Sequence, residues 1–154
     1  MALIGTSARG NERVTFDLAG QSDVWLHARA LPGAHVVVRT GGRELPGRVL
    51  LQAARLAAHY SRGREAGRVV VDWTLRKHDR KIRGGPPGLV SYVNEQTVRV
   101  VPGVVSSEKR VAVTIVAHAL LEGRLALDPV AEYGRHGLQL KRERVSRRGP
   151  AQGR

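Results

Sequence analysis

Two histidines beside short apolar runs are the residues of this sequence whose spacing suggests chemistry. His27 follows the run Val24–Leu26, and His35 precedes the run Val36–Val38. If the runs form a hairpin, the two rings can lie close together across it. Such a pair could bind a metal ion, or serve as general acid and base in RNA cleavage. Asp23 is the nearest acid and no carboxylate cluster joins the pair, so local hydrogen bonding within a hairpin is the alternative interpretation.

A dense run of cations is the second group of interest. Five basic residues and one histidine fall within eight positions, and the cations are Arg76, Lys77, Arg80, Lys81 and Arg83. Such a loop can place several cations along a phosphate backbone, and arginine can contact phosphate through two parallel hydrogen bonds. The following Gly-Gly-Pro-Pro-Gly would let a ligand approach the backbone closely. The alternative is a charged loop that is simply solvated.

Arginines and tryptophans flank the histidines. Arg29 and Arg39 follow the two apolar runs, so they could line one part of a binding surface together with the histidines. Trp25 and Trp73 could stack on nucleic-acid bases. Both tryptophans lie inside apolar strand patterns, however, and packing in the core is the preferred interpretation.

The composition indicates a negatively charged partner. The 154 residues include 26 Lys and Arg against 13 Asp and Glu, a formal net charge of +13, which favours nucleic acid or an anionic surface. Cysteine is absent, which excludes disulfides, a thiolate nucleophile and a cysteine-based zinc site. No signal peptide or long apolar run is recognisable, so we expect a cytoplasmic protein with no membrane partner.

The hairpin sequence resembles a known family. Asp23-Val24-Trp25-Leu26-His27 and Pro32-Gly33-Ala34-His35-Val36 are similar to the D-L-W-x-H and P-G-S-H-V core of the NFACT-R domain, an RNA-binding module of bacterial and archaeal proteins often called fibronectin-binding proteins. The resemblance covers about residues 3–102. Further matching positions are Ile4, Gly5, Ala8, Asn11, Asp72, Thr74, Lys77, Arg80, Lys81, Gly84, Pro87, Gly88 and Tyr92. Gly10, Ala34 and Ile82 depart from the family pattern of Gln, Ser and Pro.

The resemblance implies a function in ribosome-associated quality control, where family members act on stalled large subunits that carry tRNA. We therefore expect a non-catalytic module, without a cofactor, that contacts tRNA or large-subunit ribosomal RNA and has the ribosome as a partner. Family members have a preceding strand and N-terminal domains that are missing here, so a separate chain could supply those domains. Two alternatives remain: a small RNA-cleaving enzyme that uses His27 and His35, and a surface adhesin, against which the missing signal peptide argues.

These residues need an α+β scaffold, which we expect to be an antiparallel sheet packed against one main helix. Apolar residues at three- and four-residue spacing predict a helix over Arg48–Arg62, with Pro46 in its first turn and Gly63 at its end. Apolar alternation predicts six strands that share one sheet: Val14–Ala19, Val24–Arg29, His35–Arg39, Arg68–Leu75, Leu89–Val93 and Thr97–Val101.

Turns and boundaries complete the expected scaffold. Pro32-Gly33 suits the middle of a type II turn, Asn94-Glu95 suits a hairpin, and residues 3–11 read as the end of a strand followed by a polar loop. The domain is expected to occupy residues 1–102, followed by an extension over 103–133. Within that extension, Val105–Gly123 could be a helix or a strand. Residues 134–154 are expected to be a disordered basic tail that adds RNA affinity without selectivity.

Overall fold

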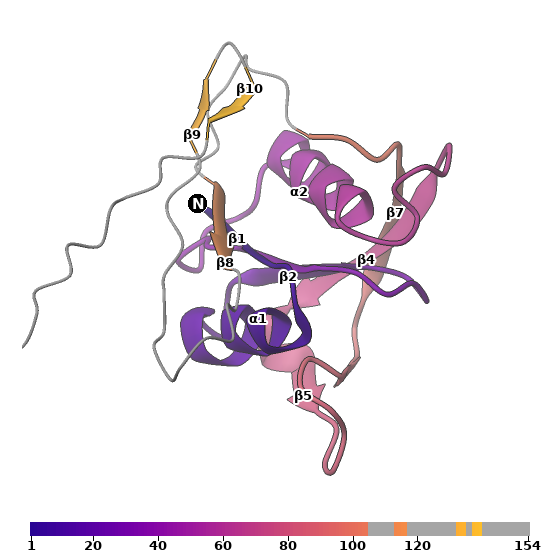
Figure 1. The fold of residues 1–154 in the computed structure, drawn as a ribbon. Coiled ribbons are helices and arrows are strands. Elements are labelled where there is room, and N and C mark those ends of the chain that lie inside the picture. The colour runs from indigo at the N-terminus through magenta and orange to yellow at the C-terminus, as the bar shows by residue number, and fades with distance from the viewer. Residues whose placement is uncertain (105–112, 117–131, 135–136, 140–154) are drawn as a thin grey trace, which may run out of the picture.

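The computed structural model describes residues 1–104, 113–116, 132–134 and 137–139. It is built around a six-stranded sheet in the order β7-β4-β2-β3-β1-β8, with the helix α2 on one face and α1 on the other (Figure 1). Neighbouring strands are antiparallel except β1 and β8, which are parallel. The strands of this sheet are β1 (Ala2–Gly5), β2 (Val24–Ala28), β3 (His35–Val38), β4 (Val69–Leu75), β7 (Gln96–Val100) and β8 (Val113–Val116). The predicted α+β fold class is therefore confirmed.

The sheet separates two hydrophobic clusters, because successive side chains of a strand point to opposite faces. On β2, Leu26 belongs to the larger cluster beneath α2, and Trp25 belongs to the smaller cluster on the other face. Trp25 is fully buried, and Trp73 on β4 packs against the larger cluster. Core packing of both tryptophans, preferred from the sequence, is confirmed.

The helix α2 (Gly47–His59) confirms the predicted helix, and it ends three residues early. Pro46 is its N-cap residue, where the missing N–H costs little. Four of its alanines are buried, and these small side chains let the helix lie close to the sheet: Ala53, Ala54, Ala57 and Ala58. The chain leaves the helix after Tyr60 because Ser61 forms a backbone bridge with Gly33.

The predicted strand Val14–Ala19 is wrong. The chain instead forms the helix α1 (Ala8–Glu12), which continues directly into the π-helix η1 (Arg13–Leu18). Consecutive buried pairs recur at helical spacing, since Gly10 and Asn11 are followed four residues later by Val14 and Thr15. The prediction of a polar loop within residues 3–11 is also wrong from Ala8 onward, where the helix begins. The helix begins there because the Ser7 hydroxyl accepts a hydrogen bond from the Gly10 N–H at 3.0 Å.

The turn between β2 and β3 differs from the predicted type II turn. Gly33 does not have the positive φ that this turn requires at its third position, and Ala30 has a φ of 55° instead. Gly33 is needed for close packing, since a Cβ there would lie 2.7 Å from the Ser61 Cβ. The predicted antiparallel pairing of the two strands is confirmed, with Val24 opposite Val38.

The expectation that all strands share one sheet is wrong for Leu89–Val93. Its central part, β6 (Val90–Tyr92), pairs with β5 (Asp79–Lys81) in a separate two-stranded sheet, and β7 pairs with β4. The predicted hairpin at Asn94-Glu95 therefore does not form. Asn94 has a φ of 56°, and the Thr74 hydroxyl donates to the carbonyl oxygen of Val93 at 3.0 Å, which redirects the chain between the two sheets.

Little of the C-terminal third is described. The strand β8 lies within Val105–Gly123, where helix and strand were both open, and the rest of that segment lies outside the described residues. A short antiparallel pair, β9 (Glu132–Gly134) and β10 (Gly137–Gln139), spans the predicted boundary between the extension and the basic tail. Most of the tail also lies outside the described residues.

Candidate functional site

The predicted cationic loop is an ordered hairpin. Its first residues form the 3-10 helix η2 (Arg76–His78), and β5 and β6 then form a hairpin whose tip spans residues 82–89. Arg76 is held against the protein, because its Nε donates to the carbonyl oxygen of Thr15 at 2.7 Å and its guanidinium lies 4.8 Å from the Phe16 ring centroid. Arg76 is therefore mainly a structural contact with η1.

Glu12 on α1 fixes the hairpin in place. One carboxylate oxygen lies 2.7 Å from the Lys81 Nζ, and the other accepts the Gly88 N–H at 3.2 Å. The hydrogen bond from Lys81 is the main reason that the pKa of Glu12 is lowered. Gly88 has a φ of 78°, and a Cβ there would lie 2.5 Å from the Ala8 carbonyl oxygen, so the tip docks backbone to backbone on α1.

The remaining cations of the hairpin face solvent. Lys77, Arg80, Lys81 and Arg83 are all exposed. Arg80 donates to the backbone carbonyl oxygens of Lys77 and Asp79, which leaves the rest of its guanidinium accessible. Four of the five cations predicted from this loop therefore lie together on one ordered, docked element.

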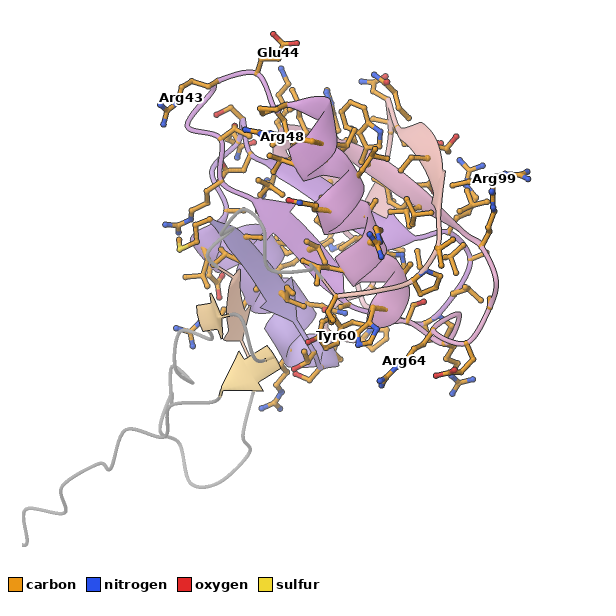
Figure 2. The ribbon with its side chains drawn as sticks, turned by 90° about the horizontal axis from the view of Figure 1, so that it is seen from above. Arg43, Glu44, Arg48, Tyr60, Arg64 and Arg99 are labelled. Atoms are coloured by element: carbon orange, nitrogen blue, oxygen red, sulfur yellow. The ribbon has the colours of Figure 1, made fainter. Side chains whose placement is uncertain are left out.

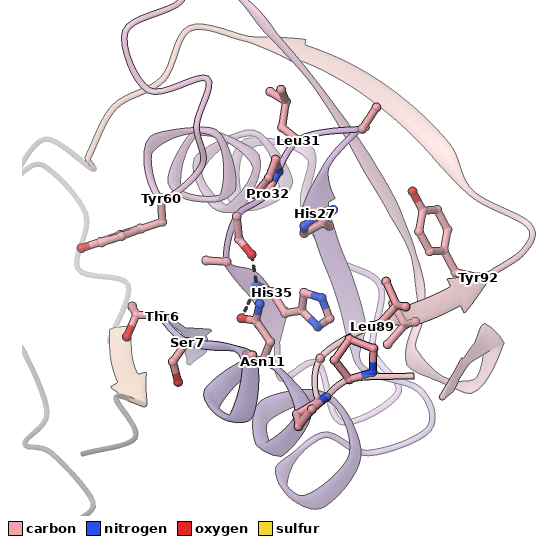
Figure 3. Close-up of a pocket in the computed structure, with 18 residues that line it drawn as sticks. Thr6, Ser7, Asn11, His27, Leu31, Pro32, His35, Tyr60, Leu89 and Tyr92 are labelled. Atoms are coloured by element: carbon pink, nitrogen blue, oxygen red, sulfur yellow. Dashed lines mark hydrogen bonds between the residues drawn. The ribbon is translucent and has the colours of Figure 1, made fainter. Parts of the chain in front are cut away.

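Beside the hairpin tip lies a cavity of about 700 Å³ (Figure 3). The tip contributes Pro86, Pro87 and Gly88 to its lining, and the turn between β2 and β3 contributes the opposite wall. Both predicted histidines, His27 and His35, line the cavity. The sequence motifs singled out separately thus meet in one place.

The two histidines form an aromatic group with Trp25. The His27 and His35 ring centroids are 5.2 Å apart and the rings are nearly perpendicular, at 84°. Trp25 stacks on His27 at 5.8 Å with an interplanar angle of 18°, and it meets His35 edge-on. Tyr92 from β6 packs on Trp25 with centroids 4.8 Å apart. The predicted proximity of the two histidines is confirmed.

Burial keeps both imidazoles neutral near pH 7. The pKa of His35 is lowered to about 3, mainly by burial and in smaller part by the neighbouring His27. Burial also lowers the pKa of His27, with Asp72 and a hydrogen bond to the backbone of Gly33 acting in the opposite direction. A neutral ring is a poor general acid, so the pair is better suited to hydrogen bonding with a ligand than to acid–base cleavage. Among the described residues, no group of three His, Asp or Glu side chains could hold a metal ion.

The buried carboxylate of Asp72 positions Tyr92, which forms another part of the cavity wall. Asp72 on β4 lies directly opposite His27 on β2. Its Oδ1 lies 2.8 Å from the Arg29 Nη2, and its Oδ2 accepts hydrogen bonds from the Arg29 Nε at 3.0 Å and the Tyr92 hydroxyl at 2.7 Å. Arg29 thus contacts both carboxylate oxygens of Asp72 and neutralises its charge, and Tyr92 is held in position against Trp25.

Asn11 fixes the opposite wall. Its side-chain oxygen accepts the His35 N–H at 2.8 Å and its side-chain nitrogen donates to the Gly33 carbonyl oxygen at 3.0 Å (Figure 3). The Thr15 hydroxyl lies 2.9 Å from the His35 Nδ1, and this hydrogen bond fixes the orientation of the imidazole ring. These contacts join α1 and η1 to β3, across sequence separations that no local pattern reveals.

One predicted site residue lies apart from the others. Arg39 follows β3 at the end opposite His35, and its Nη2 donates to the Leu18 carbonyl oxygen at 2.7 Å. The structure therefore brings His27, Arg29 and His35 together and leaves Arg39 elsewhere. The sequence interpretation gave no role to Glu12, Asp72 or Tyr92. A carboxylate within the otherwise apolar run of β4 was the available signal for Asp72.

The chain is similar to parts of longer bacterial proteins. It is 38% identical over 100 residues to the Rqc2 homolog RqcH of Bacillus subtilis (strain 168), a match that covers 65% of this chain and 17% of that protein. It is 39% identical over 99 residues to the Rqc2 homolog RqcH of Streptococcus pneumoniae serotype 2 (strain D39 / NCTC 7466), covering 64% and 18%. The chain thus matches less than a fifth of these relatives' length.

A solved structure shares the fold. The C-terminal part of the fibronectin/fibrinogen-binding protein from Streptococcus suis superposes with a TM-score of 0.63 and 36% sequence identity, over 66% of this chain and 41% of that one. No family model matches the chain. The similarities support the resemblance to the NFACT family, and the narrower NFACT-R assignment still depends on the motifs. Within the described residues, no helix is both long and apolar enough to cross a membrane.

Proposed function

We propose that this chain is a non-catalytic RNA-binding module of ribosome-associated quality control, which contacts tRNA or large-subunit ribosomal RNA in the cytoplasm. Similarity to the RqcH proteins supports the cellular process and the ribosome as a partner. Because the chain matches less than a fifth of those relatives, the proposal covers only this module.

The observation that carries the proposal is the docked hairpin with four exposed cations. Lys77, Arg80, Lys81 and Arg83 are presented by an element that Glu12 and Gly88 already hold in place. A pre-ordered cationic element binds phosphates with a smaller loss of conformational entropy than a disordered tail would. Arg29 is tied to Asp72 and Lys81 to Glu12, so these two cations contribute less to phosphate binding than the sequence interpretation expected.

The salt dependence of RNA binding tests this proposal. We would change Lys77, Arg80 and Arg83 together to alanine and keep Lys81, because its ion pair with Glu12 docks the hairpin. Removing one cation from a phosphate should flatten the log–log dependence of affinity on salt by about 0.7 units for single-stranded RNA, so the slope of the triple variant should fall by roughly two units. The free energy of unfolding should change by less than about 0.5 kcal/mol, since these are exposed side chains.

The control removes the same charge elsewhere. Arg43 and Arg48 lie before and at the start of α2, and Arg99 lies on the edge strand β7 (Figure 2). All three are exposed, so changing them to alanine lowers the net charge equally. If this control flattens the salt dependence as much as the hairpin triple, the hairpin has no special role and the proposal is wrong.

A further inference from the structure

The cavity beside the hairpin has an uncharged lining in a strongly basic protein. None of the described side chains that line its 700 Å³ belongs to Lys, Arg, Asp or Glu, although the chain carries 26 basic residues. Its histidines are kept neutral by burial. A phosphate group would find no cation inside it, so the cavity suits an uncharged, partly apolar group.

One cation is linked to the cavity wall, because the Glu12 carboxylate holds both the Lys81 Nζ and the N–H of the lining residue Gly88. The hairpin that carries Lys81 and Arg83 also supplies the wall residues Pro86, Pro87 and Gly88. An RNA backbone bound along these cations would therefore pass the mouth of the cavity. Its phosphates would lie beside the cations, and its uncharged bases would lie beside the uncharged cavity.

The polar atoms inside the cavity fit the edge of a heterocycle. A neutral imidazole has one donor and one acceptor nitrogen. The neutral rings of His27 and His35 therefore each bring one donor and one acceptor to the cavity wall. His35 uses its Nδ1 with Thr15, so its Nε2 is the nitrogen left for a ligand. Because Trp25 stacks on His27 and the two imidazoles are nearly perpendicular, a flat ligand stacked on one ring would present its edge to the other.

We propose that this cavity binds one unstacked nucleobase of the RNA strand held by the hairpin. This inference rests on the proposed RNA-binding function. Single-stranded RNA is commonly recognised through splayed bases that stack on aromatic rings and hydrogen-bond along their edges. The cavity volume lies within the range of about 300–1,000 Å³ typical of small-molecule sites, which leaves room for one base and its ribose.

The test compares an intact oligoadenylate hexamer with an abasic ribose-phosphate hexamer of equal charge, using the full chain. Stacking of one base should make the intact strand bind about five- to a hundredfold more tightly. His27→Leu removes the ring nitrogens, and Ala8→Leu places a larger side chain on an exposed residue of the cavity wall. Both variants should lose most of the preference for the intact strand and keep the affinity for the abasic strand.

Ala66→Leu is the matched control for Ala8→Leu, because Ala66 is also exposed and lies outside the cavity. It should keep the wild-type preference. Equal affinity of the wild type for both strands, or an unchanged preference in His27→Leu and Ala8→Leu, would overturn the base-binding inference. In either case, a salt dependence that the hairpin triple flattens would leave the RNA-binding proposal standing. Failure of both strands to bind would overturn both proposals.

Discussion

The two faces of the main sheet bury different kinds of side chain. The face beneath α2 is apolar throughout, with Leu26, Val36 and Val71 packed against the helix alanines. The opposite face buries Asn11, Thr15, His35, Asp72 and Asp79 beside a smaller apolar cluster. Burying a polar group costs free energy unless a partner is present, and neither carboxylate oxygen of Asp79 has a partner among the described residues, so stability alone poorly explains this face. We therefore propose that the α2 face mainly stabilises the domain and that the opposite face carries the binding site.

The largest expected effect comes from the α2 face. Leu26→Ala should lower the free energy of unfolding by about 2–5 kcal/mol, because Leu26 is fully buried and its loss leaves a cavity. The affinity of the folded variant for RNA should stay at the wild-type value. Chemical denaturation and RNA titration at a temperature where the variant is folded would measure the two quantities.

Leu89→Ala is the same change on the other face. Leu89 is 47% exposed and lines the cavity, so its removal should change stability by less than about 0.5 kcal/mol and should weaken RNA binding. If both variants lose stability and affinity in the same proportion, the division of roles between the faces is wrong.

The next effect concerns Asp79, at the base of the hairpin. Neither of its carboxylate oxygens has a hydrogen-bond partner among the described residues, and burial raises its pKa from 3.8 to about 7 despite the opposing charges of Arg76 and Arg80. A raised carboxyl pKa contributes stability below the unfolded-state value, and this stability is lost as the pH rises through the folded-state value. Relative to Asp79→Asn, the wild type should therefore lose about 2–4 kcal/mol between pH 4 and pH 7.

Urea denaturation of the wild type and Asp79→Asn across this pH range would measure the difference. A stability difference that does not vary with pH would show that the pKa of Asp79 is not raised. The result would sharpen the comparison of the two faces, because no carboxyl or imidazole group belongs to the larger apolar cluster beneath α2.

A smaller effect of opposite sign comes from His35. Burial lowers its pKa from 6.5 to about 3, so the stability it contributes is present above pH 6.5 and is lost as the pH falls toward 3. At pH 5 the wild type should be about 2 kcal/mol less stable, relative to His35→Gln, than it is at pH 7. The two windows overlap, so the effects of Asp79 and His35 should largely cancel in the wild type. The stability of Asp79→Asn should then vary with pH as His35 dictates, and that of His35→Gln as Asp79 dictates. If the stability of neither variant changes with pH, this account is contradicted.

The sequence predicted the elements whose periodicity is local. The strands of the central hairpin, the strand β4 and the helix α2 follow from alternating or helical spacing of apolar residues. The strand prediction for Val14–Ala19 failed because V-T-F-D-L-A alternates like a strand, and the burial of adjacent Val14 and Thr15 becomes visible only once the helix is formed. Leu89–Val93 was recognised as extended, but periodicity does not say which strand it pairs with.

The site was predictable in its parts and not in its assembly. The histidine pair and the cationic run stand out by residue type. Their connection depends on Glu12, which meets Lys81 across 69 residues, and on Asp72, which meets Arg29 across 43. Such contacts come from tertiary packing, so the sequence alone could not show that the hairpin docks beside the histidines.

The most direct test of the division between the two faces is to map RNA contacts by NMR on the folded full chain. Adding a short single-stranded RNA at low salt should shift the backbone amide signals of the hairpin tip, η2 and the cavity wall around His35. The signals of Ala53–Ala58 in α2 should remain unchanged. Shifts concentrated on α2, or spread evenly over all exposed basic residues, would contradict the account.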